Sequence, residues 1–150
     1  CLSRGLGDVY KRQTMKVKVG DFGYLPTRSH ITDAGMDLYA PKPVVLPAGG
    51  LVKVHLDIAV QLPVSTYGKI EGRSSLAARG VDVLGGVVDE GYRGEIAVVL
   101  KNNSDFRLEF NRGDRIAQLI VQPYIAATPE LVDELDDTER GAGGFGSTGN

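Results

Sequence analysis

The spacing of turn-forming residues constrains this chain more than any other feature of its sequence. Short β-prone runs, such as the alternating residues 15–19 and 106–110, are separated by Gly, Pro, Asn and Asp at intervals of about eight to twelve residues. Only residues 72–80 carry a convincing helix signal, in which serines are expected to cap the start and a glycine to end it. The pattern predicts an all-β domain, either a sandwich or a jelly-roll-like barrel. Residues 51–62 are expected to form one long β-rich run.

Composition excludes several classes of function. The chain has 150 residues and a net charge of −2, with Lys and Arg scattered, so a surface that follows nucleic-acid phosphates is not expected. No apolar run is long enough to cross a bilayer, so no membrane association is expected. Cys1 is the only cysteine, which excludes an intramolecular disulfide and fits a reducing, cytoplasmic location.

Residues 1–14 look foreign to the domain. From Ser3 to Gln13 they resemble the conceptual translation of a transposase-type sequencing adapter, and Met15 follows as a natural start. A targeting segment is the alternative, but the apolar stretch of a secretory signal is missing. We therefore expect a non-native leader at 1–14, a β domain at 15–139 and a glycine-rich C-terminal arm at 140–150.

The stretch 85–96 is the most informative for chemistry. Glu90 and Gly91 are expected to join two short strands as a hairpin, which would place Asp89 and Tyr92 near a tight turn. Gly85, Gly86 and Gly94 of this stretch leave bare backbone that a flat ligand can approach closely. An ordinary hairpin with a solvated aspartate is the alternative interpretation.

Two further stretches suggest an anion site and a buried polar group. Arg73, Ser74 and Ser75 at the start of the expected helix offer a guanidinium, hydroxyls and free backbone N–H groups, although a plain capped turn would have the same residues. Asp37 and Gln118 each lie in an apolar strand, so each must find a partner. Asp37 could have a purely structural role, with another residue or water as its partner. The partner of Gln118 could be a neighbouring strand or a ligand.

The C-terminal end of the chain cannot order itself. Residues 140–150 are rich in glycine, which loses the most backbone freedom on folding. A disordered tail is one interpretation. An arm that orders over a ligand is the other, because Phe145 could stack on a base while Arg140 and the hydroxyls contact phosphate. The acidic residues 130–139 are most simply a solvated face or linker.

Five stretches together resemble a known family. In chain order they read AGMDLYAP, GRSSLAARG, GGVVDEGYRGEI, RGDRIAQLI and RGAGGFGSTG, and they resemble the five motifs of the trimeric dUTP diphosphatases, or dUTPases. The resemblance implies a distorted jelly-roll (β-clip) barrel, a homotrimer with active sites at subunit interfaces, and a swapped C-terminal arm that closes over the site. It implies an enzyme that hydrolyses dUTP to dUMP and pyrophosphate.

The resemblance also implies roles for individual residues. Asp89 would activate the water that attacks the α-phosphorus, Tyr92 would pack under the deoxyribose, and Asp37 would support the phosphate and metal site indirectly. Mg²⁺ would be held by the triphosphate and waters, with no direct protein ligand. The remaining substrate contacts would be made to uracil by Gly86, Val87, Val88 and Ala97, and to the phosphates by Arg73, Ser74, Ser75, Gln118, Arg140, Gly146, Ser147 and Thr148, with Phe145 stacking on uracil.

Two departures and three rivals accompany the resemblance. Ser75 stands where many members have Gly, and Val83 where some bacterial members have an Asn that contacts uracil. A dCTP deaminase of the same superfamily would need a catalytic Glu at the position of Val99 and commonly has Trp in place of Tyr92. A non-catalytic nucleotide-binding or regulatory relative would have no evident use for Asp89. A structural jelly roll would not need the five motifs.

Overall fold

The computed structural model describes residues 13–146. Within this part of the chain the secondary structure is strand throughout, apart from one short helix. None of its helices is long and apolar enough to cross a membrane. The elements are β1 (Lys16–Val19), β2 (Gly35–Tyr39), β3 (Val44–Leu46), β4 (Leu51–His55), β5 (Ile58–Gln61), β6 (Thr66–Glu71), α2 (Ser74–Ala77), β7 (Val81–Leu84), β8 (Val87–Val88), β9 (Ala97–Asn102), β10 (Leu108–Phe110) and β11 (Arg115–Pro123).

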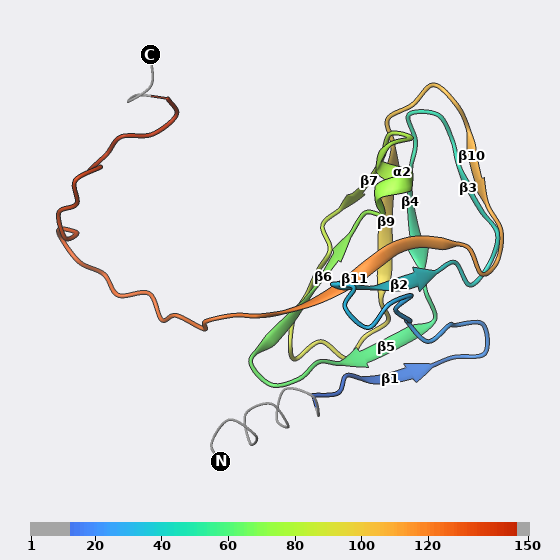
Figure 1. The fold of residues 1–150 in the computed structure, drawn as a ribbon, viewed down its shortest axis with the longest axis horizontal. Coiled ribbons are helices and arrows are strands. Elements are labelled where there is room, and N and C mark those ends of the chain that lie inside the picture. The colour runs from blue at the N-terminus through green and yellow to red at the C-terminus, as the bar shows by residue number, and fades with distance from the viewer. Residues whose placement is uncertain (1–12, 147–150) are drawn as a thin grey trace.

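The strands form small antiparallel sheets that enclose one core (Figure 1). Their orders are β1-β5, β10-β3, β2-β11-β6-β8 and β4-β9-β7. Leu38, Leu100 and Ile116 come from three of these strands and are fully buried in a shared apolar cluster. Such a core, made of alternate residues from many short strands, is the one that the period-two pattern predicts. The predicted all-β class is confirmed.

The expected β-rich run at residues 51–62 is present, but it is divided into two strands that belong to different sheets. β4 pairs with β9, whereas β5 pairs with β1. The break lies at Asp57, which has a φ of +57°. Its carboxylate accepts a hydrogen bond from the Phe22 N–H at 2.9 Å. An aspartate tolerates the left-handed region better than most residues, so the run can turn there.

The helix is shorter than expected and its serines do not cap it. α2 spans four residues, and Arg73 occupies the N-cap position without a side-chain capping bond. Ser74 and Ser75 lie inside the first turn, where their side chains are exposed. The predicted terminal glycine is confirmed: Gly80 has a φ of +87°, and its N–H donates to Ala77 O at 3.0 Å. The serine hydroxyls therefore remain available to a ligand.

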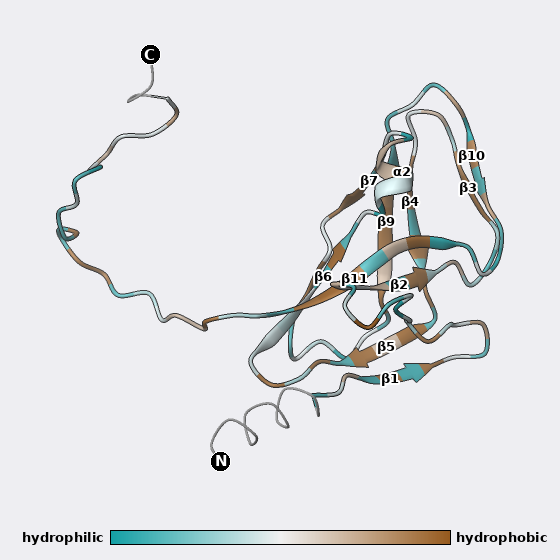
Figure 2. Ribbon diagram, viewed as in Figure 1, coloured by the Kyte–Doolittle hydropathy of each residue, from teal (hydrophilic) through white to brown (hydrophobic). Residues whose placement is uncertain are grey.

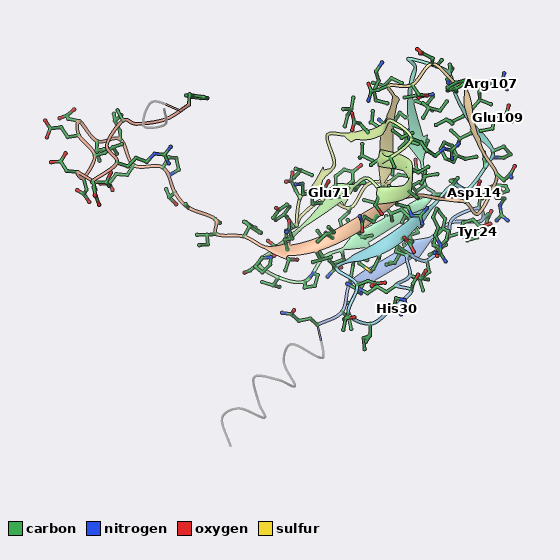
Figure 3. All side chains as sticks on the ribbon, turned by 45° about the horizontal axis from the view of Figure 1, so that its top comes forward. Tyr24, His30, Glu71, Arg107, Glu109 and Asp114 are labelled. Carbon is green, nitrogen blue, oxygen red and sulfur yellow. The ribbon has the colours of Figure 1, made fainter. Side chains whose placement is uncertain are left out.

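Beyond β11 the chain leaves the sheets. Figure 1 shows the C-terminal extension, defined here as residues 124–146, running away from the β body (residues 16–123). Figure 2 shows hydrophobic residues recurring along it, and Figure 3 shows its side chains standing clear of the body. Its large hydrophobic side chains are exposed, namely Tyr124, Ile125, Leu131, Val132, Leu135 and Phe145.

Candidate active site

Asp89 lies in a tight turn directly after β8. This strand pairs with β6, and the Tyr92 N–H donates to Asp89 O at 3.1 Å to close the turn. The expected second hairpin strand at residues 92–96 is wrong: its last residue, Ile96, bonds instead to Leu56 and Ile58 before the chain enters β9. The Arg93 guanidinium donates to Glu90 O at 2.8 Å, within the same turn.

A pocket of about 320 Å³ opens beside this turn. It brings together six residues that the sequence assigned to catalysis, sugar binding or uracil binding: Gly86, Val87, Val88, Asp89, Tyr92 and Ala97. Its remaining lining residues are Lys53, His55, Ile70, Glu95 and Ile96. We call this the base pocket.

Bare main chain forms one wall of the base pocket. Gly86 has a φ of +98°, and its carbonyl accepts a hydrogen bond from the Ile70 N–H at 2.7 Å. A Cβ at this position would lie 2.5 Å from Ile70 O, closer than any side chain can approach. The bare glycine backbone expected from the sequence is therefore present, and only glycine fits beside Ile70 at this position.

Tyr92 is held by its hydroxyl as well as by its backbone. The Tyr92 O–H donates to Glu95 O at 2.9 Å, and a Cβ on Gly94 would collide with the phenol. The Glu95 carboxylate is bonded in turn to His55 Nδ1 at 2.8 Å. The ring is 46% exposed, so one face remains free for a ligand while the hydroxyl is already engaged.

A second pocket, of about 430 Å³, gathers three arginines and two carboxylates. Three guanidinium groups line it, from Arg73, Arg79 and Arg115, together with Ser75. Its other lining residues are Leu76, Glu109, Phe110, Gly113 and Asp114; Figure 3 labels Glu109 and Asp114. We call this the arginine pocket. An arrangement of this kind binds phosphate groups through charge and bidentate hydrogen bonds.

Asp37 organises the arginine pocket from behind. Its side chain is 17% exposed and lies 3.7 Å from Arg73 Nε and 3.6 Å from Arg115 Nε. Arg73 Nη1 also donates to Arg115 O at 3.2 Å. Asp37 therefore has the partner that its burial requires, and it fixes two cations without entering the pocket. Sequence reasoning missed Arg115, although its place beside Asp37 follows from the pairing of β11 with β2.

Gln118 finds its hydrogen bond in the protein. Its Nε2 donates to Gly72 O at 2.9 Å, so the main chain just before α2 supplies the partner. In register, Gln118 pairs with Asp37 on β2 and with Glu71 on β6. The amide thus ties β11, the strand beside the one carrying Asp37, to the turn that precedes Arg73.

Parts of the expected site do not meet within one chain. The base pocket and the arginine pocket share no lining residue. Phe145 is fully exposed on the C-terminal extension, and Arg140 Nε donates locally to Gly143 O at 2.6 Å. Gly146 is the last described residue and is also exposed, whereas Ser147 and Thr148 lie outside the described residues.

One carboxylate that sequence reasoning passed over has a perturbed acidity. The pKa of Glu90 lies below the ordinary glutamate value, because the Tyr124 hydroxyl and then the Ser65 N–H donate to its carboxylate. Reciprocally, the carboxylate raises the pKa of the Tyr124 phenol. The apolar and glycine-rich surroundings in the sequence gave no signal for this contact, which joins residues far apart in the chain.

Residues 13–146 contain no group of three His, Cys, Asp or Glu side chains arranged to hold a metal ion. Asp37 is committed to two arginines, and the Glu90 carboxylate beside Asp89 is bonded to Ser65 and Tyr124. Such a donor set suits a cation that is bound mainly by its phosphate ligands and water, as Mg²⁺ commonly is.

Comparison with known proteins agrees with this geometry. A family model described as dUTPase matches residues 23–149. The deoxyuridine 5′-triphosphate nucleotidohydrolase of Kluyveromyces lactis is 47% identical over 127 residues, covering 83% of this chain and 86% of that protein. The cowpox virus enzyme of the same name is 47% identical over 124 residues, covering 83% of this chain and 84% of that protein.

Solved structures show the same fold. The dUTPase of Staphylococcus bacteriophage 80alpha with dUpNHpp matches with a TM-score of 0.84 at 28% identity, covering 91% of this chain and 99% of that one. A mutant dUTPase from phage phi11 of S. aureus, reported for its coordination of a structural Mg(II) ion, matches with a TM-score of 0.75 at 25% identity, covering 81% and 97%. With its motifs, its two pockets and these relatives in agreement, the chain belongs to the dUTPase family.

Proposed function

We propose that this chain hydrolyses dUTP to dUMP and pyrophosphate, which keeps uracil out of DNA and supplies dUMP for dTMP synthesis. The observation that carries the proposal is the base pocket, where the Asp89 carboxylate and the Tyr92 ring lie beside the bare main chain of Gly86. Positioning and charge neutralisation dominate phosphoryl transfer, so one general base and a shaped pocket suit this reaction.

In the proposed reaction Asp89 is the general base. It accepts a proton from a water molecule as the water oxygen bonds to the α-phosphorus. The bond from the α-phosphorus to the oxygen that bridges to the β-phosphorus breaks, and pyrophosphate leaves with that oxygen. The Asp89 carboxylate accepts no hydrogen bond from any residue in 13–146, so it is free to bind this water.

The base pocket would select deoxyuridine. Main-chain groups of Gly86, Val87, Val88 and Ala97 would bind the uracil edge, and the close strand would exclude the methyl group of thymine. Tyr92 would pack under the deoxyribose. Because its hydroxyl is bonded to Glu95 O, the ring cannot easily tilt away to admit a 2′-hydroxyl.

Phosphate binding would use the arginine pocket of another copy. We propose a homotrimer in which the base pocket of one subunit faces Arg73, Ser74, Ser75 and Gln118 of its neighbour. The support is geometric: the two pockets of one chain share no lining residue, although one substrate must touch both. Residue 75 needs only its N–H for this role, so Ser in place of Gly is tolerated.

The arm would complete the site. We propose that Phe145 stacks on uracil while Arg140, Gly146, Ser147 and Thr148 contact the β- and γ-phosphates of a neighbouring subunit's substrate. The fully exposed Phe145 ring supports this assignment, because an aromatic side chain held in water gains by stacking on a base.

Mg²⁺ bound to the triphosphate would neutralise part of its charge. The residues that would accompany it are the arginines of the arginine pocket, with Asp37 holding Arg73 and Arg115 in place.

We further propose that residues 1–14 are a non-native leader and that the protein acts in the cytoplasm. Among the relatives, the Dictyostelium discoideum enzyme is described as mitochondrial.

Product analysis tests the function. The full chain is incubated with Mg²⁺ and, separately, with dUTP, dCTP, dTTP and UTP, and the nucleotide and pyrophosphate formed are measured. Formation of dUMP and pyrophosphate from dUTP alone is expected. Deamination of dCTP, or binding of dUTP without turnover, would overturn the proposal and point to the deaminase or to the non-catalytic relative.

A further inference from the structure

After β8, the turn that carries Asp89 is closed mainly by hydrogen bonds between its own residues, from the Tyr92 N–H and from Arg93. β8 contributes two pairs with β6, and the residues after it form no ladder until β9 begins. Asp89 is exposed, and within residues 13–146 its carboxylate receives no hydrogen bond. The position of a general base must nevertheless be fixed closely, because misplacement by about 1 Å can cost about 100-fold in rate.

The next residue, Glu90, is bound far more firmly. One carboxylate oxygen accepts from the Ser65 N–H at 2.7 Å, and the other accepts from the Tyr124 O–H at 2.8 Å. The Tyr124 N–H donates in turn to Ser65 O at 3.2 Å. These three residues form a closed ring of hydrogen bonds, which we call the Glu90 clamp. Hydrogen bonds to a charged acceptor are the stronger kind.

The clamp joins the catalytic turn to the root of the C-terminal extension. Tyr124 is the first residue after β11, and beyond it the chain leaves the body toward the arm (Figure 1). The Tyr67 ring packs against Tyr124 edge-on, with centroids 6.3 Å apart. Tyr67 and Tyr124 also line a pocket of about 390 Å³ together with Asp89 and Glu90, and this pocket shares Val87 and Asp89 with the base pocket.

We propose that Glu90 is a positioning residue that ties the Asp89 turn to the root of the C-terminal extension. The general base and the start of the extension thereby keep a fixed position relative to each other. The proposal rests on the proposed function, because it concerns the placement of the base in that reaction. Glu90 does not touch the substrate in this scheme. It acts through the turn that it anchors.

Two substitutions remove the clamp and one matched control spares it. Glu90→Gln removes the charge, and Tyr124→Phe removes one donor. Tyr67→Phe also removes one phenolic hydroxyl from the same cluster, but that hydroxyl donates to Gln122 at 2.9 Å and not to Glu90. General loosening of this region would therefore affect all three variants, whereas loss of the clamp affects only two.

Steady-state kinetics with dUTP give the first readout. We expect kcat to fall by about three- to tenfold in Glu90→Gln and in Tyr124→Phe, as for loss of one or two hydrogen bonds. KM and the affinity for dUpNHpp should stay within about twofold, and the double variant should lose no more than the worse single one. Tyr67→Phe should keep the wild-type kcat. Unchanged kcat in both clamp variants, or an equal loss in Tyr67→Phe, would overturn the proposal.

Amide hydrogen exchange gives a second readout that needs no turnover. The Tyr92 N–H closes the Asp89 turn, so its exchange reports on that turn directly. It should accelerate in both clamp variants and not in Tyr67→Phe. If the wild-type chain fails to hydrolyse dUTP, the proposed function fails, and the Tyr92 exchange alone decides whether Glu90 holds the turn. Unchanged Tyr92 exchange in both clamp variants would then refute it.

Discussion

The β body and the C-terminal extension use the same apolar residues in opposite ways. In the body Leu100 and Ile116 are 0% exposed, whereas in the extension Leu131 is 100% exposed and Ile125 92%. Burial of apolar area drives folding, so the body's hydrophobic residues are explained within one chain. The exposed hydrophobic residues of the extension have no such explanation within one chain. Exposed apolar side chains at this density are typical of interaction segments, which agrees with the arm that we propose.

The same contrast divides the site. The base pocket and the arginine pocket belong to the body and are formed by its strands, so their shape should not depend on ligand. Phe145 and Arg140 belong to the extension, and their proposed role requires them to move onto a substrate. Experiments that affect one region and spare the other therefore test whether the body and the extension have these separate roles.

The largest effect should come from Asp89→Asn. Removing the general base should lower kcat for dUTP by about 10²–10⁴-fold, because proton transfer contributes that much. Asn has nearly the same shape as Asp, so dUpNHpp should bind as it does to the wild type, by calorimetry, and the melting temperature should hold. Wild-type turnover in Asp89→Asn would refute the assignment of the base.

Deleting residues 140–150 should have the next largest effect. We expect kcat/KM to fall on the order of 10²-fold, since the proposed arm would contribute positioning and exclude water. Light scattering should show the same oligomeric state as the full chain, the proposed trimer, because the body is left whole. The chain has no Trp, so Phe145→Trp supplies a single fluorescent reporter, whose emission should change when dUpNHpp binds. An undiminished rate after the deletion would place catalysis in the body alone.

Matched leucine truncations compare the two regions directly. Leu100→Ala should lower the free energy of unfolding by about 2–5 kcal/mol, because it leaves a cavity in the core. Leu131→Ala should change it by less than about 0.5 kcal/mol. Urea unfolding at fixed protein concentration measures both. Equal losses would mean that the extension folds together with the body, and the comparison would fail.

The smallest effect concerns Glu90 and pH. Its pKa is lowered in the folded state by the Tyr124 and Ser65 donors, so folding favours the carboxylate. The stabilisation it provides is therefore present above the ordinary glutamate pKa and is lost as pH falls through the folded-state value. Wild type should be more stable than Glu90→Gln at about pH 7, and the difference should shrink in acid. A difference that does not change with pH would exclude the charged clamp.

Much of the fold and of the site could be predicted from sequence. Period-two patterns and turn residues predicted the all-β class, and the polar residues within apolar strands predicted partners for Asp37 and Gln118. Both partners exist. These predictions succeeded because alternation and the cost of an unpaired buried polar group are local properties of a strand.

The failures came from long-range pairing. Nothing local in residues 51–62 marks Asp57 as the point where the chain changes sheet, because its left-handed backbone is held by Phe22, far back in the sequence. Residues 92–96 have strand-forming character, yet Ile96 pairs with residues outside the expected hairpin. The Glu90 clamp was invisible for the same reason, since it joins three separate segments.

Gly86 has an evolutionary consequence. With a positive φ and the Ile70 carbonyl 2.5 Å from where a Cβ would lie, every coded replacement is excluded, since all of them carry that carbon. This part of the base pocket lining is thus fixed by the path of the main chain, and no single substitution at position 86 can reshape it without moving β6 or β8. A lineage in which the pocket acquired a different ligand preference would therefore have to alter the main chain around β6 and β8, or change other residues of the pocket lining.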